Sequence, residues 1–210
     1  MIELAAVSIG TRTALERRAR RLAWGGNVWH LVEFGVAVGA GVSASSIALI
    51  GFGADSLVEV FSGLVVVWLF TGTRRGSPAA ERLAQQLVAV SFFVLAAYVG
   101  EESIRDLAAG HRPHASWIGI GLAAVTAPSM PLFAVAKRRV GRELGSAATV
   151  REGAQNLVCA YLSVALLVGL LLNALAGWWW ADPAAALVIA GIAAREGRES
   201  WRGEPCCDAC

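Results

Sequence analysis

Charged residues are scarce in this sequence, at 16% of its 210 residues. A soluble domain usually carries about 25%. Hydrophobic residues make up 56%, the mean hydropathy is +0.58, and the apolar residues fall in repeated helix-length runs. A bilayer core is crossed by about 20 such residues. This shortage of charge argues against a soluble enzyme, and the sequence predicts an all-α, polytopic membrane helical bundle.

Lysine is nearly absent, since Lys137 is the only one and arginine supplies the other basic residues. The net charge is only +2, and the positive charges fall between apolar runs rather than on one basic surface. We therefore expect no nucleic-acid partner. We also expect no signal peptide, because residues 1–10 are weakly apolar and residues 11–22 are rich in arginine.

The cysteines do not form a disulfide framework. Cys159 lies in an apolar run, and the other three, Cys206, Cys207 and Cys210, crowd the last five residues. These three thiols either capture soft metal cations from the cytosol or simply stay reduced in an unstructured tail.

The apolar runs predict six transmembrane helices between a basic cytoplasmic segment (1–23) and a cytoplasmic Cys-rich tail (196–210). Within the expected transmembrane domain (24–195), the first four spans are about 24–42, 46–71, 83–100 and 116–136. The fifth starts between residues 146 and 157 and ends near 177, and the sixth is about 184–194. Residues 11–22 are expected to form a separate amphipathic helix on the membrane surface. Pro128 and Pro131 should kink the fourth span.

Six spans place both termini on one side of the membrane, together with most of the arginines. Short cytoplasmic loops are the ones enriched in Lys and Arg. Both termini are therefore expected in the cytoplasm, with Trp178–Trp180 as an aromatic belt on the outer side. The cell membrane is the expected location, and lipid is one expected partner.

The run SIALIGFGADSLVEVFS places two carboxylates, Asp55 and Glu59, one helical turn apart within an apolar segment. Acids inside a membrane helix are costly and usually mark a binding site or a pathway. The sequence shows no Lys or Arg within the expected spans to pair with them, although a buried ion pair is the alternative. A visiting cation or bound protons would then neutralise them.

The fifth span offers a second pair at the same spacing, Gln155 and Cys159. Facing Asp55 and Glu59, this pair would complete a four-point cage suited to zinc or a neighbouring divalent metal. The pairs lie at the same depth only if the fifth helix starts near residue 146 or tilts. Each residue also has a structural alternative, an interhelical hydrogen bond for Gln155 and simple packing for Cys159.

The first span contains Asn27, His30 and Glu33. Glu33 falls near mid-bilayer, where it would serve as an accessory ligand or a proton carrier, and His30 would shuttle protons nearer the cytoplasmic side. Hydrogen bonding within the bundle is the alternative for each of them.

The run SIALIGFGADSLVEV resembles the second transmembrane helix of the cation diffusion facilitator family of metal/proton antiporters, where the acid pair is spaced DxxxD. The runs REGAQNLVCAYLS and GWWWADP resemble the fifth helix and the start of the sixth. Typical members supply HxxxD from the fifth helix, where this chain has Gln155 and Cys159. The closest likeness is to a short subgroup that lacks the C-terminal cytoplasmic domain.

The resemblance implies export of divalent, zinc-like cations from the cytoplasm in exchange for protons, without a permanently bound cofactor. It also implies a homodimer, here formed through transmembrane helices. A competing hypothesis is a membrane metal sensor or assembly partner that kept the fold without transporting. An enzyme is not expected, because no nucleophile–base pair or HExxH motif is present.

Overall fold

The computed structural model describes residues 2–69, 78–144 and 147–202, and in these ranges it contains helices and no strand. This confirms the predicted all-α class. The helices are α1 (Ile2–Ala44), α2 (Ile47–Leu69), α3 (Pro78–Ala109), α4 (Trp117–Leu144), α5 (Ala147–Ala176) and α6 (Ala181–Arg202).

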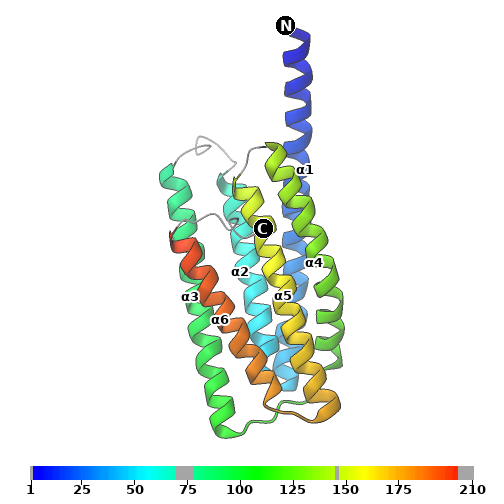
Figure 1. The fold of residues 1–210 in the computed structure, drawn as a ribbon, viewed down its shortest axis with the longest axis vertical. Coiled ribbons are helices and arrows are strands. Elements are labelled where there is room, and N and C mark those ends of the chain that lie inside the picture. The colour runs from blue at the N-terminus through cyan, green and yellow to red at the C-terminus, as the bar shows by residue number, and fades with distance from the viewer. Residues whose placement is uncertain (1, 70–77, 145–146, 203–210) are drawn as a thin grey trace.

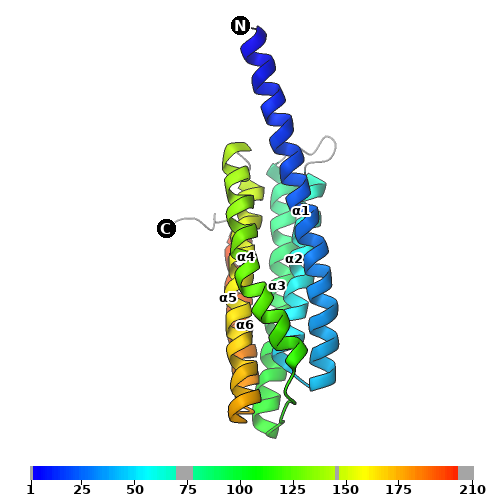
Figure 2. The ribbon, with the colours of Figure 1, turned by 90° about the vertical axis from the view of Figure 1, so that its right-hand side faces the viewer.

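The helices form an elongated bundle in which consecutive helices run in opposite directions (Figures 1 and 2). The most extensive packing joins α1 to α2, α3 to α6, and α4 to α5. The N-terminal end of α1 and the C-terminal end of α6 lie toward the same end of the bundle (Figure 1). We call this end, which also carries the start of α5 and the end of α4, the basic end.

The first helix corrects one expectation. Instead of a surface helix over 11–22 followed by a separate span, α1 is continuous from Ile2 to Ala44, and its N-terminal part projects beyond the bundle (Figure 2). Residues 11–22 are rich in Arg, Ala and Leu, which are good helix formers, and α1 has no proline to end the helix.

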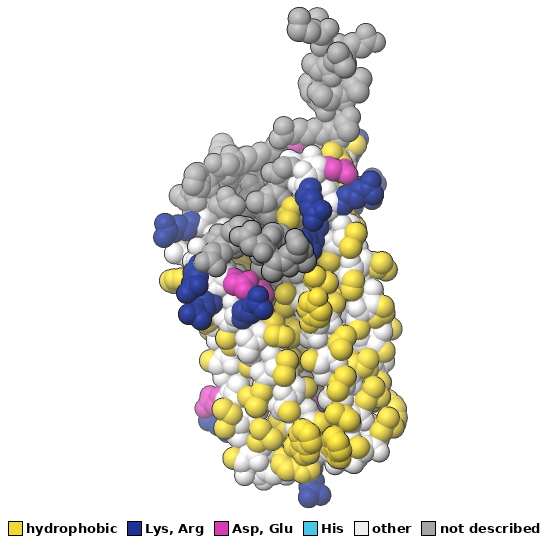
Figure 3. All heavy atoms as spheres, viewed as in Figure 1, with side chains coloured by type: hydrophobic (Ala, Val, Ile, Leu, Met, Phe, Trp, Pro, Cys, Tyr) yellow, Lys and Arg dark blue, Asp and Glu magenta, His cyan; other side chains and the backbone are white. Residues whose placement is uncertain are grey.

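The outer surface is apolar along most of the bundle. Figure 3 shows hydrophobic side chains over most of one face, with most of its Lys and Arg side chains gathered near the basic end. Among the described helices, α2, α3, α4 and α5 contain segments long and apolar enough to cross a membrane. Large apolar side chains such as Leu132 and Leu175 are more than 70% exposed, as expected for side chains that face lipid.

The opposite end of the bundle is held by a carboxylate from α6. Asp182 is buried and accepts hydrogen bonds from Ser46 Oγ at 2.5 Å and from the Ala48 amide at 3.3 Å. These groups lie at the start of α2, so Asp182 caps a helix that is distant in sequence. The contact holds the first turn of α2 in place. It therefore also fixes the position of Asp55 and Glu59 along the axis of the bundle.

The fourth helix is longer than the sequence indicated. It runs through Pro128 and Pro131, changes direction along its length (Figure 2), and continues to Leu144. The expected span ended at residue 136, just before Lys137, but Lys137 lies inside the helix and is only 2% exposed. Met130, Ala134, Lys137 and Gly141 follow each other at helical spacing on the buried face, which accounts for the inward position of the lysine.

Candidate metal centre

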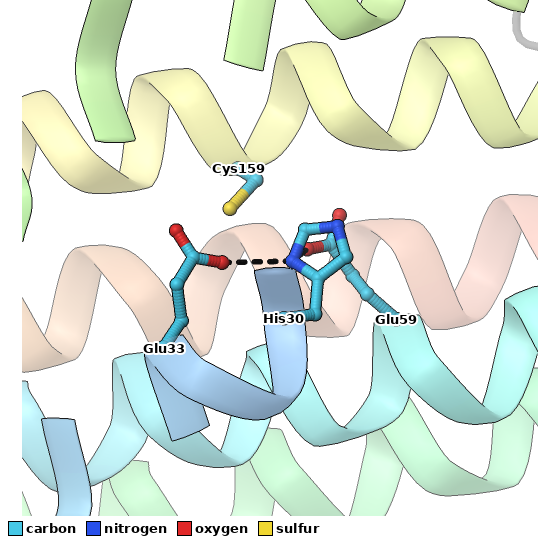
Figure 4. Close-up of side chains that lie close together, drawn as sticks. All are labelled: His30, Glu33, Glu59 and Cys159. Atoms are coloured by element: carbon cyan, nitrogen blue, oxygen red, sulfur yellow. Dashed lines mark hydrogen bonds and ion pairs between the residues drawn. The ribbon is translucent and has the colours of Figure 1, made fainter. Parts of the chain in front are cut away.

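Four buried side chains from three helices converge near the middle of the bundle. His30 and Glu33 come from α1, Glu59 from α2 and Cys159 from α5, and one ligand atom from each lies within 4.8 Å of all the others. Figure 4 shows the Cys159 side chain pointing from α5 toward the other three. We call these four residues the cluster.

Local sequence explains how the helices present these groups. His30 and Glu33 are three residues apart, so they share one face of α1. Gly53 lets α2 approach that helix closely, because a Cβ at this position would lie 2.8 Å from a Val38 methyl carbon. On α5, Cys159 is 1% exposed among apolar neighbours, and the helix starts at Ala147, as the depth argument required.

The imidazole of His30 joins the two carboxylates. Its Nδ1 lies 2.8 Å from Glu33 Oε2 and 2.9 Å from Glu59 Oε2. This corrects the expectation that no basic group within the spans reaches the acid pair. The correction depends on packing, because His30 is distant from Glu59 in sequence and meets it only when α1 lies against α2.

Two further side chains orient the cluster. Thr126 of α4 donates a hydrogen bond to Glu33 Oε1 at 2.5 Å, and both residues are fully buried. Asn156 Nδ2 lies 3.1 Å from His30 Nε2, and it also donates to Met130 Sδ at 3.4 Å. In this arrangement the amide donates to His30 Nε2, so the ring carries its proton on Nδ1, toward the two carboxylates. Neither Thr126 nor Asn156 was predicted, since a hydroxyl and an amide in apolar helices are ordinary packing residues.

The cluster differs from the cage expected from sequence. Glu59 and Cys159 belong to it, whereas Asp55 does not. Asp55 is buried one helical turn from Glu59, on the side away from the basic end. Gln155 Oε1 accepts a hydrogen bond from Ser62 Oγ at 3.1 Å.

The residues expected to play accessory roles are distributed between two places. His30 and Glu33 belong to the cluster, and Asn27 lines a small cavity beside it. Cys206, Cys207 and Cys210 lie outside the described residues, so their role as a metal-capture tail stays a prediction.

The donor set fits a divalent transition metal. One imidazole nitrogen, two carboxylate oxygens and one thiol sulfur are donors of the kinds that bind zinc. With metal–ligand bonds of about 2.1 Å, tetrahedral ligands lie about 3.4 Å apart. The most distant pair, at up to 4.8 Å, must therefore approach by about 1.4 Å, and the two distances from His30 Nδ1 to the carboxylates, 2.8 and 2.9 Å, must lengthen by about 0.5 Å.

Comparison with known proteins agrees with this chemistry. Residues 28–202 match the family model described as the cation efflux transmembrane domain. A protein of Synechocystis sp. named as an uncharacterized transporter is 25% identical over 167 residues, which are 76% of this chain and 54% of that protein. The chain thus spans about half the length of this curated relative. The family model covers most of the chain, including every residue of the cluster, and the protein belongs to the cation efflux transmembrane domain family.

Proposed function

We propose that this protein carries divalent transition-metal cations, zinc or a similar ion, out of the cytoplasm across the cell membrane in exchange for protons. The observation that carries the proposal is the convergence of His30, Glu33, Glu59 and Cys159 within 4.8 Å, buried inside an apolar bundle. Membership of the family supports cation transport, and the donor set of this chain supports a transition metal as the transported ion.

The thiol supports a transition metal over calcium or magnesium. Hard cations such as Ca²⁺ and Mg²⁺ favour oxygen throughout, whereas thiolate and imidazole favour zinc and its neighbours. In this proposal, the four donors of the cluster form the first shell. Asp55, one turn away on α2, contributes further negative charge, and Gln155 lies toward the basic end.

Proton exchange follows from the same donors. A metal ion and a proton compete for the lone pairs of a carboxylate, a thiolate or an imidazole, so protonation releases the metal. The cluster and Asp55 together contain three carboxylates and one imidazole. A divalent cation, or the protons that replace it, would balance the excess negative charge.

The direction of transport rests on the distribution of arginine. If the basic end faces the cytoplasm, as the positive-inside tendency favours, the ion enters from that end and leaves past Asp55. Pro128 and Pro131 in α4 weaken the helix at the level of Thr126, which supports bending near the site. A homodimer through transmembrane helices is also part of this proposal.

The experiment is metal flux in proteoliposomes that contain purified protein and dyes for Zn²⁺ and for pH. We expect Zn²⁺ movement coupled to opposite proton movement, and loss of both in Glu59→Gln and Cys159→Ala. Ser91→Ala is the matched control for Cys159→Ala and should leave the flux unchanged. Among the described residues, the Ser91 hydroxyl binds only the Leu87 carbonyl of its own helix turn, at 3.1 Å. Zn²⁺ binding without flux would support the metal sensor instead, and absence of both would refute the proposed site.

A further inference from the structure

A second polar site lies beside the cluster, toward the basic end. A cavity of about 10 Å³ is lined by His30 and Glu59 of the cluster and by five further residues, Asn27, Lys137, Glu152, Gln155 and Asn156. Asn27 precedes His30 on α1, and Glu152, Gln155 and Asn156 precede Cys159 on α5. Both helices start at the basic end (Figure 1), so an ion from that side would reach this cavity before the cluster.

One wall of this cavity already carries a positive charge, the side-chain ammonium of Lys137. Lys137 Nζ lies 2.8 Å from Glu152 Oε1, and the two side chains are 2% and 7% exposed. Lys137 is the only lysine of the chain. Its compact ammonium sits on a flexible stem, and it can withdraw from a partner more easily than a planar, bidentate guanidinium.

Glycines keep this arrangement open. A Cβ at Gly26 would lie 2.8 Å from Lys137 Nζ, so the absence of a side chain on α1 makes room for the ammonium. A Cβ at Gly63 would collide with the Asn27 amide oxygen, so α2 makes similar room for that side chain. Both glycines therefore leave space for polar groups inside the bundle.

Several polar atoms around the cavity lack partners. Asn27 Nδ2, Gln155 Nε2 and Asn156 Oδ1 are buried and make no hydrogen bond within the described part of the chain. Asn27 and Asn156 are only 3% and 2% exposed. Such groups are costly unless water or an ion meets them, and the cavity is about large enough for one water.

We propose that this cavity is a second divalent-cation site, an access site in which the Lys137 ammonium holds the place of the metal until an incoming ion displaces it. The ion would be bound by the Glu152 carboxylate, the Asn156 amide oxygen and a retained water, which uses one lone pair for the ion and accepts from Asn27 or Gln155 with the other. Because both positive charges need Glu152, ion and ammonium exclude each other. The proposal rests on the proposed function, since it supplies the ion to the cluster.

The single lysine makes a direct test possible. Purified full-length protein in detergent is treated at neutral pH with an amine-acetylating reagent, with and without Zn²⁺, and the acetylation of Lys137 is measured by mass spectrometry against that of the N-terminal amine. Displacement from Glu152 should speed Lys137 acetylation about tenfold, which corresponds to a shift of about 1.4 kcal/mol in its pairing. An unchanged rate would overturn the proposal.

Two variants separate this site from the cluster. In Glu33→Gln/Cys159→Ala the cluster is disabled but the cavity is intact, and the response to Zn²⁺ should persist. Loss of the response there would mean that the effect is transmitted from the cluster, which would also overturn the proposal. In Glu152→Gln acetylation should be fast without metal and insensitive to it, and Glu152→Asp, which keeps the charge, should restore the response if the Gln variant fails to fold.

The proposed function and the access site can fail independently. If proteoliposomes show no Zn²⁺ flux but Zn²⁺ still speeds the acetylation of Lys137, transport is refuted and the access site is supported. If the flux is normal but Zn²⁺ does not change the acetylation of Lys137, transport is supported and the access site is refuted.

Discussion

Replacing Thr126 by valine tests how strongly a single hydroxyl positions the cluster. Valine has nearly the same shape as threonine, so packing on α4 is preserved while the hydrogen bond to Glu33 Oε1, 2.5 Å long, is lost. Thr126 and Glu33 are both fully buried, so bulk water has no access to replace the hydroxyl.

The expected magnitude follows from the type of bond. A hydrogen bond to a charged group contributes about 1.5–3 kcal/mol. Each 1.4 kcal/mol corresponds to about a tenfold change in affinity, so the Zn²⁺ affinity should fall about 10- to 100-fold. His30 still contacts the other oxygen of Glu33 at 2.8 Å, and some affinity should therefore remain.

The assay is calorimetric titration of purified protein with Zn²⁺. Thr126→Ser keeps the hydroxyl and should bind nearly as well as the unmodified protein. Ser129→Ala, on the same helix, removes a hydroxyl that donates to the backbone at Val125, and it should leave the affinity unchanged. The reasoning would be refuted if Thr126→Val bound Zn²⁺ within about threefold of the unmodified protein, which is less than about 0.7 kcal/mol.

Three further predictions concern the ion and the packing. Cys159→Asp replaces sulfur by oxygen, so in a competition titration the preference for Zn²⁺ over Mn²⁺ should fall, and an unchanged preference would show that the thiol is not a ligand. Asp182→Ala removes the acceptor for Ser46 and the Ala48 amide, and thermal unfolding in detergent should show a loss of about 1–3 kcal/mol; an unchanged transition would contradict this capping role. Gly63→Ala should lower stability through its clash with Asn27, whereas Gly25→Ala, which would meet no atom within 4 Å, should not, and equal melting curves for the two variants would refute the close approach.

The class of the protein could be predicted from sequence because it depends on composition and periodicity. Long apolar runs separated by short polar segments have few solutions other than a helical membrane bundle. The acid pair on α2 was equally visible, since a carboxylate within an apolar run is conspicuous wherever the helix packs. Glu59 was identified as a site residue for this reason and Cys159 from its spacing to Gln155, and the structure brings both into the cluster.

The partners of these residues depend on how the helices pack. Which residue of α1 meets Glu59 is set by the rotation and height of α1 against α2, and neither is encoded in the spacing along one helix. His30 and Glu33 consequently complete the cluster together with Glu59 and Cys159. The hydroxyl of Thr126 likewise gains its role only because α4 places it against Glu33.

The sequence by itself determined that this chain is a membrane bundle with buried acids and a buried thiol, because local composition and helical period suffice for that conclusion. Only the tertiary structure decided that His30 links two of the acids and that the single lysine faces inward against Glu152. These contacts join residues of different helices, and their geometry arises from side-chain packing across the whole bundle.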